Sequence, residues 1–219
     1  MNKLILLGDS TCAIKERTAR PETGWGEVFY QYVSPEWTVL NFAKNGRSTA
    51  SCLSEGIFSR ALITASAGDA AIIELGHNDQ KKDERGTEPF SRYAANLIYM
   101  AAELRKKGVD VYFVTSVPRR KFGGGRPLDS HKDYIAAMKW AGHQISVPVI
   151  DITIPLMMDL AVLGDEESKK YYMNFGPGLY ENYPDGKDDN THLRPEGALW
   201  VAREIASGLK ALGCTFMRP

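Results

Sequence analysis

Short apolar runs alternate along this chain with longer segments in which apolar residues recur at helical spacing. The apolar runs lie at residues 4–7, 37–42, 70–75, 109–115 and 147–151, and such runs are typical of buried parallel strands. Helical periodicity covers roughly residues 26–33, 50–66, 91–107 and 130–144, and a last helix is expected after Pro195, running through Trp200 to Leu212. The alternation predicts an α/β fold: a three-layer α/β/α sandwich with a five-stranded parallel sheet in flavodoxin-like order.

The size and composition of the chain favour a single domain over residues 1–219. With 219 residues and 43% hydrophobic content it can bury one substantial core. Its formal net charge is zero, so neither nucleic acid nor an anionic membrane is an expected partner. A small molecule or an oligosaccharide is the expected substrate, and the sequence leaves open whether the protein forms a homo-oligomer.

The first apolar run is much shorter than a signal peptide's hydrophobic region or a membrane span. A cytoplasmic location is therefore expected. Cys12, Cys52 and Cys214 are widely spaced and odd in number, so we interpret them as free thiols.

Candidate reactive residues follow the ends of the predicted strands. Gly-Asp-Ser-Thr at residues 8–11 follows the first strand, Gly46 lies after the second, and Gly-His-Asn-Asp at residues 76–79 follows the third. Ligands of such sheets bind outside the carboxyl ends of the strands. These three loops are thus expected to converge on one edge of the sheet, together with Asp-Asn-Thr-His at residues 189–192.

The convergent residues predict nucleophilic catalysis. A serine hydroxyl needs an adjacent base, and His192 can take the proton of Ser10 while Asp189 fixes the histidine tautomer. The backbone amides of Ser10 and Gly46 and the side-chain amide of Asn78 can stabilise a developing oxyanion. Each motif alone has a simpler explanation: Gly-Asp-Ser is a frequent turn sequence, and Gly46 could serve only a tight turn.

Taken together, the four blocks resemble those of the SGNH hydrolases, also called the GDSL esterase/lipase superfamily. Finer details resemble its rhamnogalacturonan acetylesterase branch: Gly-Asp-Ser-Thr at 8–11, Gly-His-Asn-Asp at 76–79, Val-Pro-Arg-Arg at 117–120 and Asp-Asn-Thr-His at 189–192. The resemblance implies Ser10, Asp189 and His192 as the triad, and the Ser10 amide, Gly46 and Asn78 as the oxyanion hole. It also implies removal of acetyl groups from pectic saccharides, without a cofactor.

Other polar residues admit weaker interpretations. His77 is expected to order its loop, and we also count His77, Arg119 and Arg120 as candidate substrate contacts. Lys44 and Arg47 belong with these arginines as possible ligands of a galacturonate carboxylate, although solvated surface charge is an equal alternative. His131 and His143 are expected on a helix as surface or satisfied core residues. No histidine pair has the spacing of a metal site, so no metal is predicted.

Three functions remain open from the sequence. The first is a serine esterase that deacetylates carbohydrate, most of all rhamnogalacturonan oligosaccharides. The second is a lysophospholipase or acyl thioesterase with the same catalytic residues, which would need an apolar groove for a longer acyl chain. The third is a carbohydrate-binding protein without turnover, and the intact set of Ser10, Asp189 and His192 argues against it.

Overall fold

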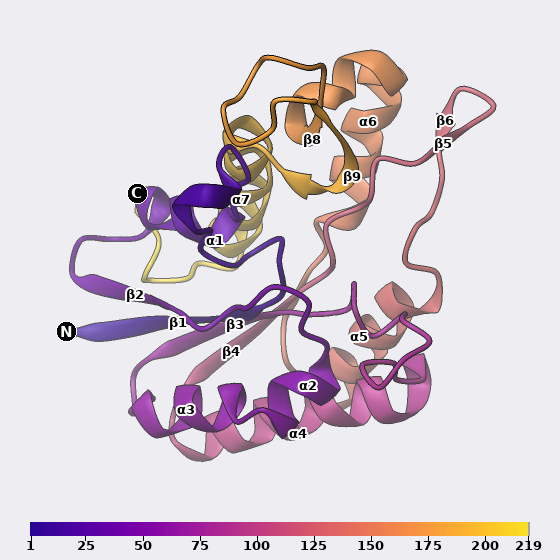
Figure 1. Ribbon diagram of the computed structural model, residues 1–219. Helices are drawn as coiled ribbons and strands as arrows, with labels where there is room; N and C mark the ends of the chain where they lie inside the picture. The colour runs from indigo at the N-terminus through magenta and orange to yellow at the C-terminus, as the bar shows by residue number, and fades with distance from the viewer. Residues whose placement is uncertain (219) are drawn as a thin grey trace.

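A five-stranded parallel sheet divides the protein into two layers of helices (Figure 1). The computed structural model describes residues 1–218. The strand order is β2-β1-β3-β4-β7, which is the flavodoxin-like order expected from the sequence. Its strands are β1 (Asn2–Gly8), β2 (Trp37–Asn41), β3 (Ala70–Glu74), β4 (Asp110–Val114) and β7 (Val149–Ile150).

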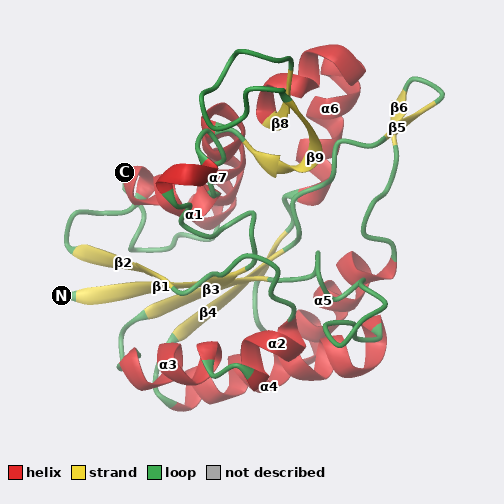
Figure 2. Cartoon of the chain, in the orientation of Figure 1, coloured by secondary structure: helices red, strands yellow, loops and turns green. Residues whose placement is uncertain are grey.

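Helices cover both faces of the sheet (Figure 2). Helices α2 (Thr49–Ser54), α3 (Ile57–Thr64), α4 (Ala94–Lys106) and α5 (Asp133–Gln144) lie on one side. Helices α1 (Trp25–Val28), α6 (Thr153–Ser168) and α7 (Pro195–Ala211) lie on the other. Short turns of helix complete the chain: η1 (Arg17–Ala19), η2 (Phe29–Tyr32), η3 (Pro89–Tyr93) and η4 (Lys169–Tyr171).

The alternating side chains of β1 explain why both faces are covered. Leu4 and Leu6 belong to the core on the α7 side, whereas Ile5 and Leu7 belong to the core on the α4 side. All four side chains are completely buried, and burying each contributes roughly 2 kcal/mol. An apolar run without polar alternation therefore requires helices on both sides of the strand.

The predicted helix over residues 50–66 is wrong as a single element. It is divided at Gly56, whose φ of +70° suits glycine, into α2 and α3. Helix α6 was not predicted, because its apolar residues do not form one stripe: Ile154, Met158 and Val162 are exposed. The helix also contains a kink at Gly164.

Two hairpins lie outside the main sheet and were also not predicted. One joins β5 (Phe122–Gly123) to β6 (Arg126–Pro127), and the other joins β8 (Tyr172–Phe175) to β9 (Lys187–Leu193). The Asp189–His192 motif lies within β9, and pairs of β9 with β8 flank it at Asp188 and at Leu193.

Among residues 1–218, no helix has both the length and the apolar character that a membrane crossing requires. The three cysteines are free thiols as predicted, with Cys12 and Cys52 buried and Cys214 half-buried.

Candidate active site

Ser10 lies in a tight turn directly behind β1. The Asp9 carboxylate accepts a hydrogen bond from the Thr11 backbone N–H (2.9 Å) and lies 3.0 Å from the Thr11 hydroxyl, and the Asp9 carbonyl accepts the N–H of Ala13 (2.9 Å). A Cβ on Gly8 would come within 2.8 Å of the Cys12 Cβ, so this position needs glycine. Asp9 therefore shapes the turn that presents Ser10.

The side chains of Ser10, His192 and Asp189 form one hydrogen-bonded chain. The Ser10 hydroxyl oxygen lies 3.0 Å from His192 Nε2, and His192 Nδ1 lies 2.7 Å from Asp189 Oδ2. The second oxygen of Asp189 accepts the backbone N–H groups of Thr191 (2.9 Å) and His192 (3.0 Å). Asp189 thus holds both the backbone and the ring of the histidine, and leaves Nε2 facing the serine.

The electrostatics of the pair keep the histidine basic. Burial alone would raise the pKa of Asp189, but the hydrogen bond and charge of His192, together with the two backbone amides, lower that pKa well below its usual range. Burial alone would lower the pKa of His192. The hydrogen bond and charge of the Asp189 carboxylate together have a larger effect than burial, so the pKa is raised. The imidazole is consequently a better proton acceptor than a free histidine.

The sequence predicts three donors for an oxyanion hole: the backbone N–H groups of Ser10 and Gly46 and the side-chain amide of Asn78. Within residues 1–218, neither the Ser10 nor the Gly46 backbone N–H donates to a protein acceptor. Gly46 has φ +78°, a conformation that glycine adopts readily. The Asn78 side-chain amide donates to the Arg47 carbonyl (3.0 Å), which leaves its second N–H available. These three groups can form an oxyanion hole without any formal charge.

Asp79 fixes the loop that carries Asn78. Its buried carboxylate accepts hydrogen bonds from the Thr49 N–H (3.1 Å), the Thr49 hydroxyl (2.5 Å) and the Thr87 hydroxyl (2.7 Å). Burial raises the pKa of Asp79 to about 6, against the lowering effect of these hydrogen bonds. Asp79 therefore connects the β3 loop to the start of α2 and to Thr87.

The position of His77 favours a role in ordering the loop over contact with substrate. The residue is 3% exposed, and His77 Nδ1 lies 3.2 Å from Nε2 of His131, which is itself completely buried. Burial, followed by the nearby charges of His131 and Arg119, lowers the pKa of His77 well below its usual value. His131 is thus a buried core residue with partners for both ring nitrogens, one of the two expected alternatives. Its expected place on a helix is wrong, because it lies just before α5.

Arg119 and Arg120 are engaged by the protein itself. Arg119 donates to the carbonyls of His77 (3.2 Å) and Ser130 (3.0 Å). Arg120 is 6% exposed and contacts the Asn190 side chain (2.8 Å) and Asp165 (2.9 Å). Both guanidinium groups thus have partners within the protein, and their role as substrate contacts stays a prediction. Arg120 connects β9, which carries His192, to Asp165 of α6.

A buried group close to the Ser10 turn was not predicted, because its members lie far apart in the sequence. Asp9, Glu74 and His77 offer ligand atoms within 4.8 Å of one another and could in principle hold a metal ion. The Thr11 hydroxyl lies within hydrogen-bond distance of both Asp9 and Glu74 but has only one proton to donate. Burial, and then the charge of Asp9, raise the pKa of Glu74 well above its usual value. We therefore interpret the two carboxyl groups as a pair that keeps a proton.

A cavity of about 460 Å³ opens beside the oxyanion loop. It is lined by Gly46 and by three arginines, Arg47, Arg85 and Arg92. Arg47 is paired with Glu55, and Arg85 with Asp83. Arg85 Nη1 makes no hydrogen bond within residues 1–218, and it would lie 3.7 Å from a Cβ placed on Gly46. This cavity therefore offers space for a substrate group next to Gly46 of the predicted oxyanion hole.

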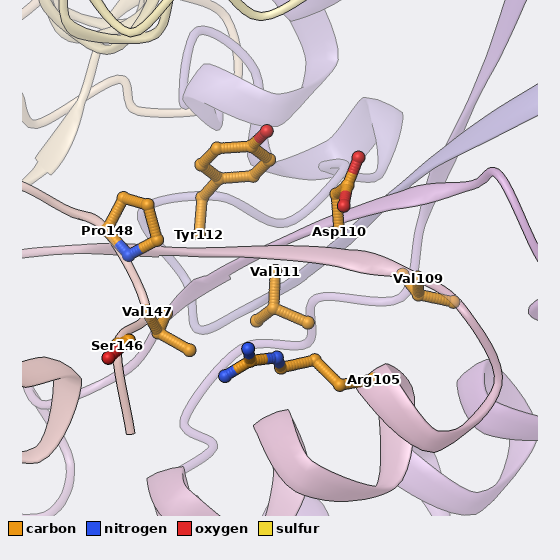
Figure 3. A pocket seen from close by; sticks show the side chains of 8 residues that line it. All are labelled: Arg105, Val109, Asp110, Val111, Tyr112, Ser146, Val147 and Pro148. Carbon is orange, nitrogen blue, oxygen red and sulfur yellow. The ribbon is translucent and has the colours of Figure 1, made fainter. Parts of the chain in front are cut away.

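A smaller cavity of about 150 Å³ lies elsewhere (Figure 3). Its lining includes Arg105 and the residues Val109–Tyr112 at the start of β4. The amino ends of parallel strands lie at the edge opposite their carboxyl ends. This cavity is therefore remote from Ser10 and is not the candidate active site.

Comparison with known proteins supports the fold and the resemblance to a known family. Residues 6–199 match the GDSL-like Lipase/Acylhydrolase family. Over 212 residues the chain is 40% identical to the rhamnogalacturonan acetylesterase RhgT of Bacillus subtilis, a match that covers 96% of this chain and 90% of that protein. It is 30% identical to the probable rhamnogalacturonan acetylesterase YesY of the same organism, over 97% of this chain and 94% of that protein.

Among solved structures, the acetylxylan esterase Axe2 of Geobacillus stearothermophilus superposes with a TM-score of 0.70. The match covers 99% of this chain and 96% of that protein at 17% identity, so it bears on the fold alone. The family match spans almost the entire sheet and every one of the four motif blocks. The chain is thus a member of the GDSL-like lipase/acylhydrolase family.

Proposed function

We propose that this protein is a carbohydrate acetylesterase that removes acetyl groups from rhamnogalacturonan oligosaccharides. One observation carries the esterase chemistry: the continuous hydrogen bonds from Ser10 through His192 to Asp189. The substrate class rests on the 40% identity to RhgT over 96% of the chain. Both point to the same reaction, hydrolysis of an acetyl ester of a sugar hydroxyl.

In the first step, Ser10 attacks the acetyl carbonyl carbon while His192 Nε2 accepts the hydroxyl proton. The Asp189 carboxylate stabilises the imidazolium that forms. The amides of Ser10, Gly46 and Asn78 then donate to the oxyanion of the tetrahedral intermediate. His192 returns its proton to the departing sugar oxygen, which leaves an acetyl-serine.

In the second step, water replaces the sugar. His192 takes a proton from the water, whose oxygen attacks the acetyl-serine carbonyl in the same oxyanion hole. Collapse of this intermediate releases acetate and returns the proton from His192 to Ser10. Uncharged donors suit both steps, because they stabilise a charge that exists only in the transition states and intermediates.

The charged lining of the cavity beside Gly46 supports a sugar over a long acyl chain. Five of its ten lining residues are charged, namely the three arginines together with Glu55 and Glu84. A long acyl chain needs an apolar groove, whereas a sugar presents hydroxyl and carboxylate groups that such side chains can bind. The proposal thus places saccharide units along this cavity.

The test is acetate release from acetylated rhamnogalacturonan oligosaccharides, measured beside p-nitrophenyl esters with acyl chains of increasing length. Ser10→Ala serves as the inactive control. We expect serine-dependent acetate release and a sharp preference for the acetyl ester. Rates that rise with acyl length, with little acetate from the oligosaccharides, would instead support the lysophospholipase or thioesterase alternative. Binding of the oligosaccharides without turnover would support the non-catalytic one.

We also propose that the protein acts in the cytoplasm, on oligosaccharides that have entered the cell. Fractionation of the source cells tests this proposal. Recovery of the serine-dependent activity outside the cytoplasmic fraction would contradict it without affecting the proposed reaction.

A further inference from the structure

A buried lysine lies beneath the proposed nucleophile. Lys15 is 5% exposed, and its side chain alone is 1% exposed. A buried ammonium group is costly unless every N–H finds an acceptor. The fold thus keeps a charged group at a position where burying an uncharged side chain would cost less free energy. The contacts of Lys15 indicate its role.

The three contacts of the Lys15 ammonium group join separate parts of the site. It donates to the Ser10 carbonyl oxygen (2.5 Å) and to the Asn45 side-chain oxygen (2.7 Å), and it pairs with Glu22 (2.7 Å). An ammonium group has three N–H donors, so all of them are used. Ser10 provides one proposed oxyanion amide, and Asn45 directly precedes Gly46, which provides another.

We propose that Lys15 is a positioning residue, which fixes the distance and orientation of the Ser10 and Gly46 amides relative to each other. These two residues follow different strands, β1 and β2, and within residues 1–218 the Lys15 ammonium group is a contact common to Ser10 and Asn45. An oxyanion hole needs donors that are already oriented before charge develops. Lys15 orients these donors from inside the protein, through its contacts with Ser10 and Asn45, and does not contact the substrate.

The charge of Lys15 acts on the base as well. Lys15 lowers the pKa of His192, and Glu22 raises it, although burial and the contact with Asp189 have larger effects. Replacing Lys15 by methionine removes the lowering charge and leaves the raising charge of Glu22 unpaired. The acidic limb of the pH profile, where His192 must be neutral, should then move to higher pH. Replacing Glu22 by glutamine should move the same limb to lower pH.

The proposal rests on the proposed esterase function, and its test uses p-nitrophenyl acetate hydrolysis by the full chain. We expect Lys15→Met to lower kcat on the order of a hundredfold, because small displacements of catalytic groups cost about that much. KM should change less than kcat. A matched control is Lys106→Met, which makes the same substitution in an exposed ion pair with Glu103 on α4 and should retain wild-type kcat.

Two further variants keep the test decisive if Lys15→Met folds poorly. Asn45→Ala removes one contact and should lower kcat about tenfold while Lys15 stays in place. Combined with Lys15→Met, it should add little, because both substitutions break the same connection. Glu22→Gln should shift the acidic limb in the direction opposite to Lys15→Met, which a purely structural role would not produce.

The outcomes separate the two proposals. If Ser10→Ala remains active, the esterase mechanism itself is wrong. If Ser10→Ala is inactive while well-folded Lys15→Met keeps kcat within about threefold of wild type and an unmoved pH profile, the role of Lys15 is wrong and the mechanism stands. Fully additive effects of Lys15→Met and Asn45→Ala would likewise overturn the proposed connection between the two amides.

Discussion

The side-chain amide of Asn78 donates a 3.0 Å hydrogen bond to the carbonyl oxygen of Arg47, across 31 residues of sequence. This contact joins the loop behind β3 to the loop behind β2, which also contains Gly46. One N–H of Asn78 is thereby fixed, and the planar amide then sets the direction of the other. The neighbouring backbone orients the Asn78 donor before any substrate binds.

Replacing Asn78 by alanine should therefore lower kcat for acetyl ester hydrolysis about a hundredfold or more, the usual cost of losing one oxyanion donor. KM should change little, because the contact forms fully only in the transition state. Steady-state kinetics with p-nitrophenyl acetate measure both. A loss of less than about threefold would indicate that Asn78 only supports the loop.

The pH dependence of kcat/KM should follow His192. Burial favours the neutral ring, but Asp189 raises the His192 pKa above its ordinary value, and the reaction requires the neutral ring as proton acceptor. Activity should thus fall on the acidic side with a midpoint above about 6.5. Asp189→Asn should move this midpoint to lower pH and reduce the rate on the order of ten thousandfold. A profile of kcat/KM measured over roughly pH 5 to 9 tests both expectations. An unchanged midpoint in Asp189→Asn would contradict the pairing of Asp189 with His192.

Asp79 should make stability depend on pH. Because burial raises its folded-state pKa from 3.8 to about 6, the folded protein holds this proton more tightly than the unfolded chain does. The resulting stabilisation is complete below the unfolded pKa and is lost as pH rises through the folded pKa, by about 3 kcal/mol in all. An asparagine at this position cannot titrate, so the stability advantage of wild type over Asp79→Asn should shrink between about pH 4 and 7. Urea unfolding of both proteins at several pH values measures this advantage. A difference in unfolding free energy that stays constant with pH would refute the prediction.

Arg85 should affect the natural substrate more than a small ester. Its free Nη1 lies beside Gly46 in the cavity, where a saccharide carboxylate or hydroxyl can reach it. We expect Arg85→Ala to raise KM for acetylated rhamnogalacturonan oligosaccharides about tenfold, equivalent to about 1.4 kcal/mol, and to leave p-nitrophenyl acetate unaffected. Equal effects on both substrates would assign Arg85 to the oxyanion loop instead of to the saccharide.

The sequence predicted the features that depend on local patterns. The uninterrupted apolar run of β1 indicated a strand covered on both faces, and the motifs behind three strands indicated one convergent edge. Resemblance to a known family supplied the roles of Ser10, Asp189 and His192. The structure brings these three side chains into contact, and their catalytic roles stay predictions until the variants are measured.

Features that depend on distant contacts could not be predicted. Lys15 looks like any surface lysine in sequence, and only the fold brings it to Ser10 and to Asn45, 30 residues away. Arg119 and Arg120 were candidate substrate contacts because a guanidinium group can bind a galacturonate carboxylate, and only the fold shows that the carbonyl of His77 and the side chain of Asn190 contact them. The apolar residues of α6 escaped detection because several of them are exposed.

The hydrogen bond between Ser10 and His192 spans 182 residues, which has a consequence for protein synthesis. Ser10 is synthesised among the first residues, and His192 only after seven sheet and hairpin strands and six of the α-helices described here. Closing so long a loop requires the intervening elements to be folded already. A nascent chain therefore exposes no working hydrolase to the cell, and the onset of turnover marks the completion of folding.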